Sequence, residues 1–256
     1  MTDLNPQGAT DSFISHLIEL RDRLVKASIG IAIACAALFS WPGPSAIYDF
    51  LAQPMIASLP VGAKMIATGV ISPFLVPMKV TLLVAFMLAL PWVLYQVWAF
   101  VAPGLYSHEK RLVAPLVISS SFLFLSGVAF CYFFVFGRVF KFINEFSPKS
   151  ITVAPDIENY LDFIMSMCLA FGVTFEVPIV VIVLVRMGLV SVDKFKLMRP
   201  YIVVGAFVIA AIVTPPDIVS MLSLAFPMWF LFELGLIVAP IFVKATQAPN
   251  HADAAE

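Results

Sequence analysis

The feature of the sequence that most constrains the fold is a series of apolar runs long enough to cross a lipid bilayer. A helix needs about 20 mostly apolar residues to span the hydrocarbon core. Residues 27–48 and 80–108 contain no Asp, Glu, Lys or Arg. Hydrophobic residues make up 61% of the chain and charged residues 12%, and the mean hydropathy is +1.00, far above the values of soluble domains. The sequence therefore predicts an all-α, polytopic membrane protein.

The apolar runs divide into six predicted transmembrane helices within a single domain, residues 1–245. The fifth is short because the sequence Thr-Pro-Pro-Asp at 214–217 halts it, and we expect the sixth to be short as well, bent or shallow in the bilayer. The final residues, 246–256, are small and polar, which predicts a disordered cytoplasmic tail. The approximate spans are 25–47, 73–100, 111–137, 157–187, 200–213 and 218–240.

The loops between these spans predict the orientation. Lys and Arg are enriched in cytoplasmic loops of membrane proteins. With both termini cytoplasmic, as an even number of spans requires, the inner side holds most of the basic residues: Arg21, Arg23, Lys26, Lys110, Arg111, Arg186, Lys194, Lys196, Arg199 and Lys244. The outer side holds Lys64, Arg138, Lys141 and Lys149. Two further features belong to the outer loops: a helical stripe of apolar residues in 46–59, typical of a helix on the membrane surface, and Asp156, positioned to N-cap the fourth span.

Several function classes find no support in the sequence. The net charge is −1, so there is no basic excess for binding nucleic acid. The chain has no phosphate-binding glycine loop, no zinc-protease motif and no nucleophile motif of the hydrolases. Its three cysteines lie in apolar runs and its three histidines are far apart. We therefore predict a protein that is not an enzyme and holds neither a metal nor another cofactor.

Glu176 is the residue whose placement is most costly, because it lies near the middle of the fourth span. Pro178 follows two positions later and removes a helical hydrogen bond, which predicts a bend. Two interpretations stay open: a polar groove at the bend, or a protonated carboxyl that hydrogen-bonds a neighbouring helix. The same two interpretations stay open for Glu233 in the sixth span, and a contact with a partner protein is a third.

Glu19 and Glu109 lie at the cytoplasmic edges of two spans, among basic residues. Each can form a local surface ion pair, such as Glu19 with Arg23 at i,i+4, which contributes little. If instead both face one surface, they suit a ligand with two guanidinium groups, because arginine binds carboxylates in bidentate geometry. Phe100 and Leu105 add apolar surface nearby.

Six segments, in this order, resemble one family closely: HLIELRDRL from residue 16, MIATGVISPF from 65, LYQVWAFVAPGLYSHEKRL from 94, AFGVTFEVP from 170, RPYIVVGAFV from 199 and IVTPPD from 212. The family is TatC, a subunit of the twin-arginine protein translocase, and the resemblance runs from residue 13 to about residue 243. It implies six helices in a concave, cupped arrangement in the bacterial cytoplasmic (inner) membrane. It also implies recognition of signal peptides with paired arginines, on proteins exported in the folded state by the proton motive force.

The resemblance also implies roles for individual residues and partners. It places signal-peptide binding on Glu19, Arg21, Phe100, Leu105 and Glu109, and an intramembrane groove on Glu176. On the outer face it singles out Pro54, Tyr132, Asp156 and Asp217. The implied partners are TatB and TatA, each with a single span, in a homo-oligomer formed together with TatB, and membrane lipids; no cofactor is implied.

Two other classes remain as alternatives. An ion-coupled secondary transporter would use Glu176 as its intramembrane carboxylate, although no internal repeat supports this. A purely structural membrane protein would explain the apolar spans but not the acidic residues at two basic edges. For the translocase subunit, we expect partner helices to dock along residues 200–230, through residues such as Gly205, Ala206 and Met221.

Overall fold

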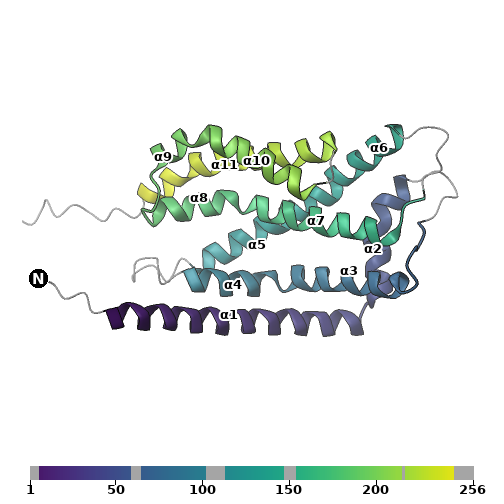
Figure 1. The fold of residues 1–256 in the computed structure, drawn as a ribbon, viewed down its shortest axis with the longest axis horizontal. Helices are drawn as coiled ribbons and strands as arrows, with labels where there is room; N and C mark the ends of the chain where they lie inside the picture. The colour runs from purple at the N-terminus through teal and green to yellow at the C-terminus, as the bar shows by residue number, and fades with distance from the viewer. Residues whose placement is uncertain (1–5, 59–64, 102–112, 147–153, 215–216, 245–256) are drawn as a thin grey trace, which may run out of the picture. The chain divides into compact units, whose positions relative to one another are not determined.

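The computed structural model describes residues 6–58, 65–101, 113–146, 154–214 and 217–244. These residues are almost entirely helical (Figure 1), and the only β pairing among them is an isolated bridge between Ile66 and Asp156. The chain divides into two compact units: Met1–Leu51 with Pro73–Ser121, and Ala52–Ser72 with Phe122–Glu256. The prediction of a single domain stays a prediction.

The first unit is built around helix α1 (Pro6–Ser40), which runs alongside α4 (Leu90–Val101) in Figure 1. Small residues let the helices pack closely, because Ala34, Ala85 and Ala89 form a buried cluster. The predicted first span, 25–47, was placed too far along the chain, since α1 ends at Ser40. Pro42 follows, and Gly43 adopts φ +92°, a conformation that favours glycine. The next helix, α2 (Pro44–Ser58), covers most of the surface helix predicted at 46–59.

The second predicted span, 73–100, is present but sharply bent. It consists of α3 (Ser72–Leu88) and α4, whose axes differ by 57° across a break at Ala89. Pro91 explains the bend, since it has no N–H to donate to the carbonyl of Met87. The sequence predicted a single span over residues 73–100, without the bend.

The second unit takes in the chain from Phe122 onwards, which is the latter part of the next helix and all the helices after it. Helix α5 (Val113–Phe130) continues through a short π-helix, η3 (Cys131–Val135), into α6 (Phe136–Phe146). The fourth predicted span is α7 (Ile157–Phe175) followed by α8 (Val177–Arg186). A short helix, α9 (Val192–Leu197), leads to α10 (Arg199–Val213), and α11 (Ile218–Lys244) packs against α7, α8, α9 and α10.

The helices of the described residues confirm the all-α, multi-pass fold class. Four stretches are long and apolar enough to cross a membrane: Ile14–Ser40, Val113–Ile143, Ile157–Arg186 and Ile218–Ile241. The bent pair α3–α4 and the shorter apolar helix α10 fall on the two other predicted spans. With 15 residues, α10 is short as predicted. Helix α11 is not short, because it has 27 residues and continues through Pro227 and Pro240.

Candidate functional site

Glu19 lies on α1, on the turn that faces the end of α4. One turn earlier, the ring of His16 stacks on the ring of Phe100, with centroids 4.3 Å apart and an interplanar angle of 22°. Glu19 is three residues after His16, so the two side chains share one face of the helix. Oε1 of Glu19 accepts hydrogen bonds from Nε and Nη2 of Arg23, at 3.1 and 2.8 Å. The local ion pair that the sequence left open is therefore present.

Arg21 lies on a different face of α1 from Glu19. Two residues along a helix correspond to a rotation of about 200°. The guanidinium of Arg21 donates from Nε and Nη2 to Oδ1 of Asp22, at 3.0 and 2.8 Å, and its side chain is 71% exposed. The apolar residues Leu17, Leu20 and Leu24 line the same shallow surface as Arg21. Arg21 and Glu19 therefore lie on different faces of α1, and the binding surface that the resemblance implies for both stays a prediction.

Two indole hydrogen bonds hold α4 in place, one near each end, and Phe100 lies at the end that Trp98 holds. Nε1 of Trp98 donates to Oγ of Ser120 on α5 at 2.9 Å, and both residues are buried. Nε1 of Trp92 donates to the carbonyl of Lys26 on α1 at 2.9 Å. The sequence prediction did not include these contacts. Leu105 and Glu109, the other predicted binding residues, lie outside the described residues.

Glu176 lies at the junction between α7 and α8. Helix α7 ends at Phe175 and α8 begins at Val177, so the helix is interrupted beside Pro178, where the sequence predicted a bend. The backbone N–H of Glu176 donates to the carbonyl of Val173 at 3.0 Å. Both carboxylate oxygens are shielded from solvent. The protein therefore keeps this carboxylate inside the helix packing.

An apolar groove of about 560 Å³ runs between α7, α10 and α11. One side of the groove is lined by residues next to the α7–α8 junction, Val173, Thr174 and Val177. Its other side is lined by Ile212 and Met228. Glu176 is not one of its lining residues. The groove is thus a separate feature from the buried carboxylate, and the polar groove predicted at Glu176 stays a prediction.

Asp156 joins two distant segments of the second unit. As predicted, it N-caps α7, since its Oδ1 accepts from the backbone N–H of Glu158 and Asn159 at 3.0 and 3.1 Å. Its Oδ2 accepts from the N–H and the hydroxyl of Thr68 at 3.0 and 2.7 Å. These bonds, led by that from the Thr68 hydroxyl, lower the pKa of the Asp156 carboxyl to about 2.

Other bonds join the same two segments. The N–H of Ile66 donates to the carbonyl of Pro155, and the N–H of Ile157 donates to the carbonyl of Ile66, each at 2.9 Å. The hydroxyl of Ser72 donates to Glu158 at 2.7 Å. Thr68, Ser72 and Glu158 were missed from the sequence, although MIATGVISPF was one of the segments quoted for the resemblance.

The remaining predicted outer-face residues occupy separate places. Asp217 precedes α11, and its Oδ1 accepts from the N–H of Ser220 at 2.7 Å, as an N-cap does. Tyr132 lies in the π-helix, with its ring edge-on to Phe133 at 5.0 Å. Pro54 lies within α2, and its side chain is outside the described part. Of this set, Asp156 and Asp217 share one structural role, the capping of a helix.

A family model for TatC, described as Sec-independent protein translocase protein (TatC), matches residues 15–227. The chain belongs to the TatC family. It is 48% identical over 229 residues to the Sec-independent protein translocase protein TatC of Haemophilus influenzae, covering 90% of this chain and 89% of that one. Its identity to the protein of the same name in Escherichia coli K12 is 46% over 234 residues, with 91% and 90% covered.

A solved structure agrees with this assignment. The crystal structure described as the twin arginine translocase receptor TatC superimposes with a TM-score of 0.77 at 34% identity, covering 88% of this chain and 98% of that one. These relatives do not favour the secondary-transporter alternative. The membership also confirms the sequence-based resemblance, and it makes this chain a multi-pass component of a protein translocase.

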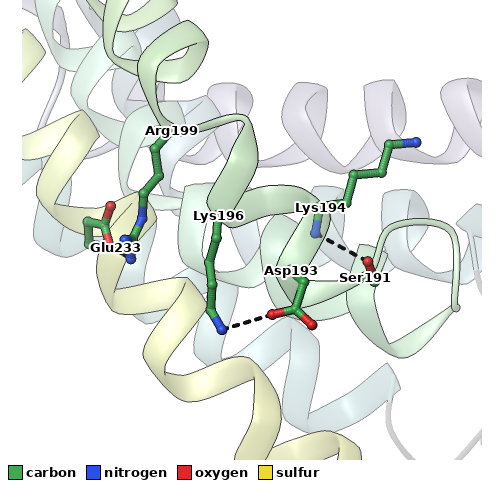
Figure 2. Close-up of polar contacts among 6 residues, drawn as sticks. All are labelled: Ser191, Asp193, Lys194, Lys196, Arg199 and Glu233. Carbon is green, nitrogen blue, oxygen red and sulfur yellow. Dashed lines mark hydrogen bonds and ion pairs between the residues drawn. The ribbon is translucent and has the colours of Figure 1, made fainter.

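In this TatC chain, a second group of polar residues lies on α9, α10 and α11 (Figure 2). Nη2 of Arg199 lies 2.6 Å from Oε2 of Glu233, and Nζ of Lys196 lies 3.0 Å from Oδ1 of Asp193. Oγ of Ser191 accepts from the N–H of Lys194 and caps α9. Glu233 therefore has an intramolecular partner, Arg199, which the sequence alone does not identify. Across the described ranges, no cluster of three or more His, Cys, Asp or Glu residues could hold a metal ion.

Proposed function

We propose that this chain is the receptor subunit of a twin-arginine translocation system, which binds the signal peptides of folded proteins. One observation carries the location of the binding site: the stacking of His16 on Phe100 places the turn of Glu19 beside the end of α4. Glu109 follows that end, Val101, by eight residues in the sequence. The solved relative is itself named as a twin arginine translocase receptor.

The contacts of Glu19 suit an exchange of partners. Both hydrogen bonds from Arg23 go to Oε1, and no donor to Oε2 is found within the described residues. The side chains of Glu19 and Arg23 are 35% and 24% exposed. An incoming arginine can bind Oε2 and then replace Arg23, so one carboxylate–guanidinium pair takes the place of another. The second arginine of the signal would pair with Glu109.

The remaining steps of the proposed mechanism depend on the apolar faces of the helices. The apolar part of the signal lies along the helices towards Glu176, and TatB and TatA dock through their single spans on α10 and α11. The groove beside Val173 and Met228 offers an apolar surface for such contacts. We place the chain in the bacterial cytoplasmic membrane with both termini inside, in an oligomer with TatB, and translocation is driven by the proton motive force.

The direct test is crosslinking of a twin-arginine signal peptide to the purified protein. We expect an adduct on residues near Glu19 and Phe100, and its loss when both signal arginines are changed to lysine. Glu19→Lys and Glu109→Lys should each abolish the adduct and the export of twin-arginine substrates, while the protein still inserts. Asp193→Lys is the control, since Asp193 is an acid with an 88% exposed side chain on α9. Normal export by a stable Glu19→Lys, Glu109→Lys double variant refutes the proposal.

A further inference from the structure

A hollow of about 270 Å³ lies in the second unit, between η3, α6 and α11. Apolar side chains, three of them from phenylalanines, form most of its wall, and two polar residues, Arg138 and Ser223, complete it. Phe134 and Phe226 are 56% and 55% exposed, so the hollow is open on one side. The residues of the hollow used in the argument are Phe130, Phe134, Arg138, Ser223, Phe226 and Pro227.

Both walls of the hollow are irregular helices, which explains why they do not close on each other. On one wall, the π-helix Cys131–Val135 widens the turn that precedes Arg138. On the other, Pro227 lies inside α11 and removes the N–H that would bond the carbonyl of Ser223. The π-helix and Pro227 lie on opposite walls of the hollow, so the sequence of both helices creates it.

Arg138 carries the only formal charge among the residues that line the hollow. Across the described residues it has no ion-pair partner, since the nearby Glu145 on the same helix pairs with Lys141 at 3.8 Å. A guanidinium on an apolar surface is costly unless an anion or water reaches it. It binds phosphate groups in bidentate geometry, which makes a phosphate the complementary ligand.

The position of Arg138 along its span fits a lipid headgroup. The helical path from Val113 to Arg138 is about 37 Å at 1.5 Å per residue, and the hydrocarbon core of a bilayer is about 30 Å thick. Arg138 therefore reaches the headgroup level at the far end of the Val113–Ile143 span. Ser223 lies five residues after the start of α11, at the same end.

The lining of the hollow favours a lipid over a protein helix, because a single guanidinium lies beside apolar side chains, as a lipid phosphate lies beside its acyl chains. We propose that this hollow binds one glycerophospholipid, with its phosphate on Arg138 and an acyl chain against Phe130, Phe134 and Phe226.

Native mass spectrometry of the purified full chain, titrated with phosphatidylglycerol, tests the proposal. We expect one saturable lipid, and Arg138→Gln should weaken its binding at least fivefold. Lys141→Gln is the matched control, because Lys141 is a base on the same helix outside the hollow, and it should bind within twofold of the wild type. Diacylglycerol, which lacks the phosphate, should bind the wild type no better than phosphatidylglycerol binds Arg138→Gln. Equal binding by the wild type and Arg138→Gln overturns the proposal.

Three further measurements separate lipid binding from misfolding, from anion binding and from a protein contact. Ser223→Leu fills the hollow without changing its charge and should also weaken lipid binding, so the proposal stays testable if Arg138→Gln folds poorly.

Glycerol phosphate has the anion but no acyl chains. If it displaces the lipid at equal concentration, the hollow is only an anion site, which would contradict the proposal. A photocrosslinker at Leu222, which lines the hollow, should add the mass of one phospholipid in membranes. Adducts with polypeptide alone would show that a protein partner occupies the hollow and would overturn the proposal.

Discussion

Arg199, at the start of α10, pairs with Glu233 on α11 at 2.6 Å between Nη2 and Oε2. The two residues are 34 positions apart, so the pair fixes the beginning of one helix against the middle of another. The side chain of Glu233 is 22% exposed and that of Arg199 is 47% exposed. Solvent therefore screens the pair only in part, and we expect it to contribute more to stability than a fully exposed pair.

We predict that Arg199 and Glu233 stabilise the protein as a coupled pair. Glu233→Gln and Arg199→Gln should each lower the melting temperature, and a double-mutant cycle should give a coupling free energy of about 0.5–1 kcal/mol. Thermal unfolding in detergent measures this. Asp193→Asn removes the exposed Lys196–Asp193 pair and should change the stability by less than about 0.5 kcal/mol. Additive effects of the two Gln variants would show that the ion pair does not couple the helices.

The lowered pKa of Asp156 predicts how the stability of the protein depends on pH. Its pKa is lowered to about 2 in the folded protein, below the ordinary value of about 3.9. A carboxyl with a depressed folded pKa stabilises the protein above its unfolded pKa, and this contribution is lost as the pH falls towards the folded pKa. The difference in melting temperature between the wild type and Asp156→Asn should therefore be constant above about pH 5 and should shrink as the pH falls towards 2. A difference that does not vary with pH would contradict the assignment.

Hydrogen exchange can separate the two roles of Asp156, the cap on α7 and the bonds to Thr68. Asparagine keeps an oxygen that can cap α7, but its NH₂ group donates and cannot replace Oδ2 as the acceptor for Thr68. Asp156→Asn should speed exchange at the Thr68 amide while the Glu158 and Asn159 amides stay protected. Asp156→Ala should speed exchange at all three, and Thr68→Val should leave the cap on α7 intact. Equal exchange patterns in the Asn and Ala variants would contradict this division of roles.

These residues also show what the sequence could predict. The cap at Asp156 and the interruption at Pro178 were predictable, because each depends on the chemistry of one residue within its own helix. The bonds of Asp156 to Thr68 and of Arg199 to Glu233 join positions 88 and 34 residues apart, and hydrophobic periodicity carries no information about such pairs. The end of α1 was placed too late because the apolar run continues past Pro42 and Gly43, although the backbone does not continue as a helix.

The candidate site was predictable in part. Glu19 and Phe100 lie on neighbouring helices, α1 and α4, but Arg21 lies on another face because positions two apart are on nearly opposite sides of a helix. The motif LYQVWAFVAPGLYSHEKRL contains Trp98 but does not identify Ser120 as its partner. Whether Glu19 and Glu109 lie within reach of one signal peptide stays a prediction.

Helix α8 approaches α11 at Gly235. A Cβ atom at this position would lie 2.9 Å from Cα of Pro178, a backbone atom that no side-chain movement can displace. Gly235→Ala should therefore push α8 away and cost about 1–3 kcal/mol. Gly205→Ala on α10 is the matched control, because no atom lies within 4 Å of the new Cβ, and replacing a helical glycine there should stabilise by about 0.5–1 kcal/mol. Similar melting temperatures for the two variants would show that the contact at Pro178 relaxes freely.

The hydrogen bond between Trp98 and Ser120 links stability to the proposed signal-peptide site. Both side chains are buried, so Trp98→Phe leaves the Ser120 hydroxyl without its donor at a cost of about 1–3 kcal/mol. Phe100 lies two residues further along α4, and loosening this end should weaken signal-peptide binding, by up to about tenfold for 1.4 kcal/mol. The Trp98→Phe, Ser120→Ala double variant removes both polar groups and should recover part of the loss. Trp92→Phe removes the other indole bond at a residue that is 46% exposed, so its effect on peptide affinity should be smaller. If Trp98→Phe lowers the melting temperature but binds the peptide like the wild type, the end of α4 does not form part of the binding surface.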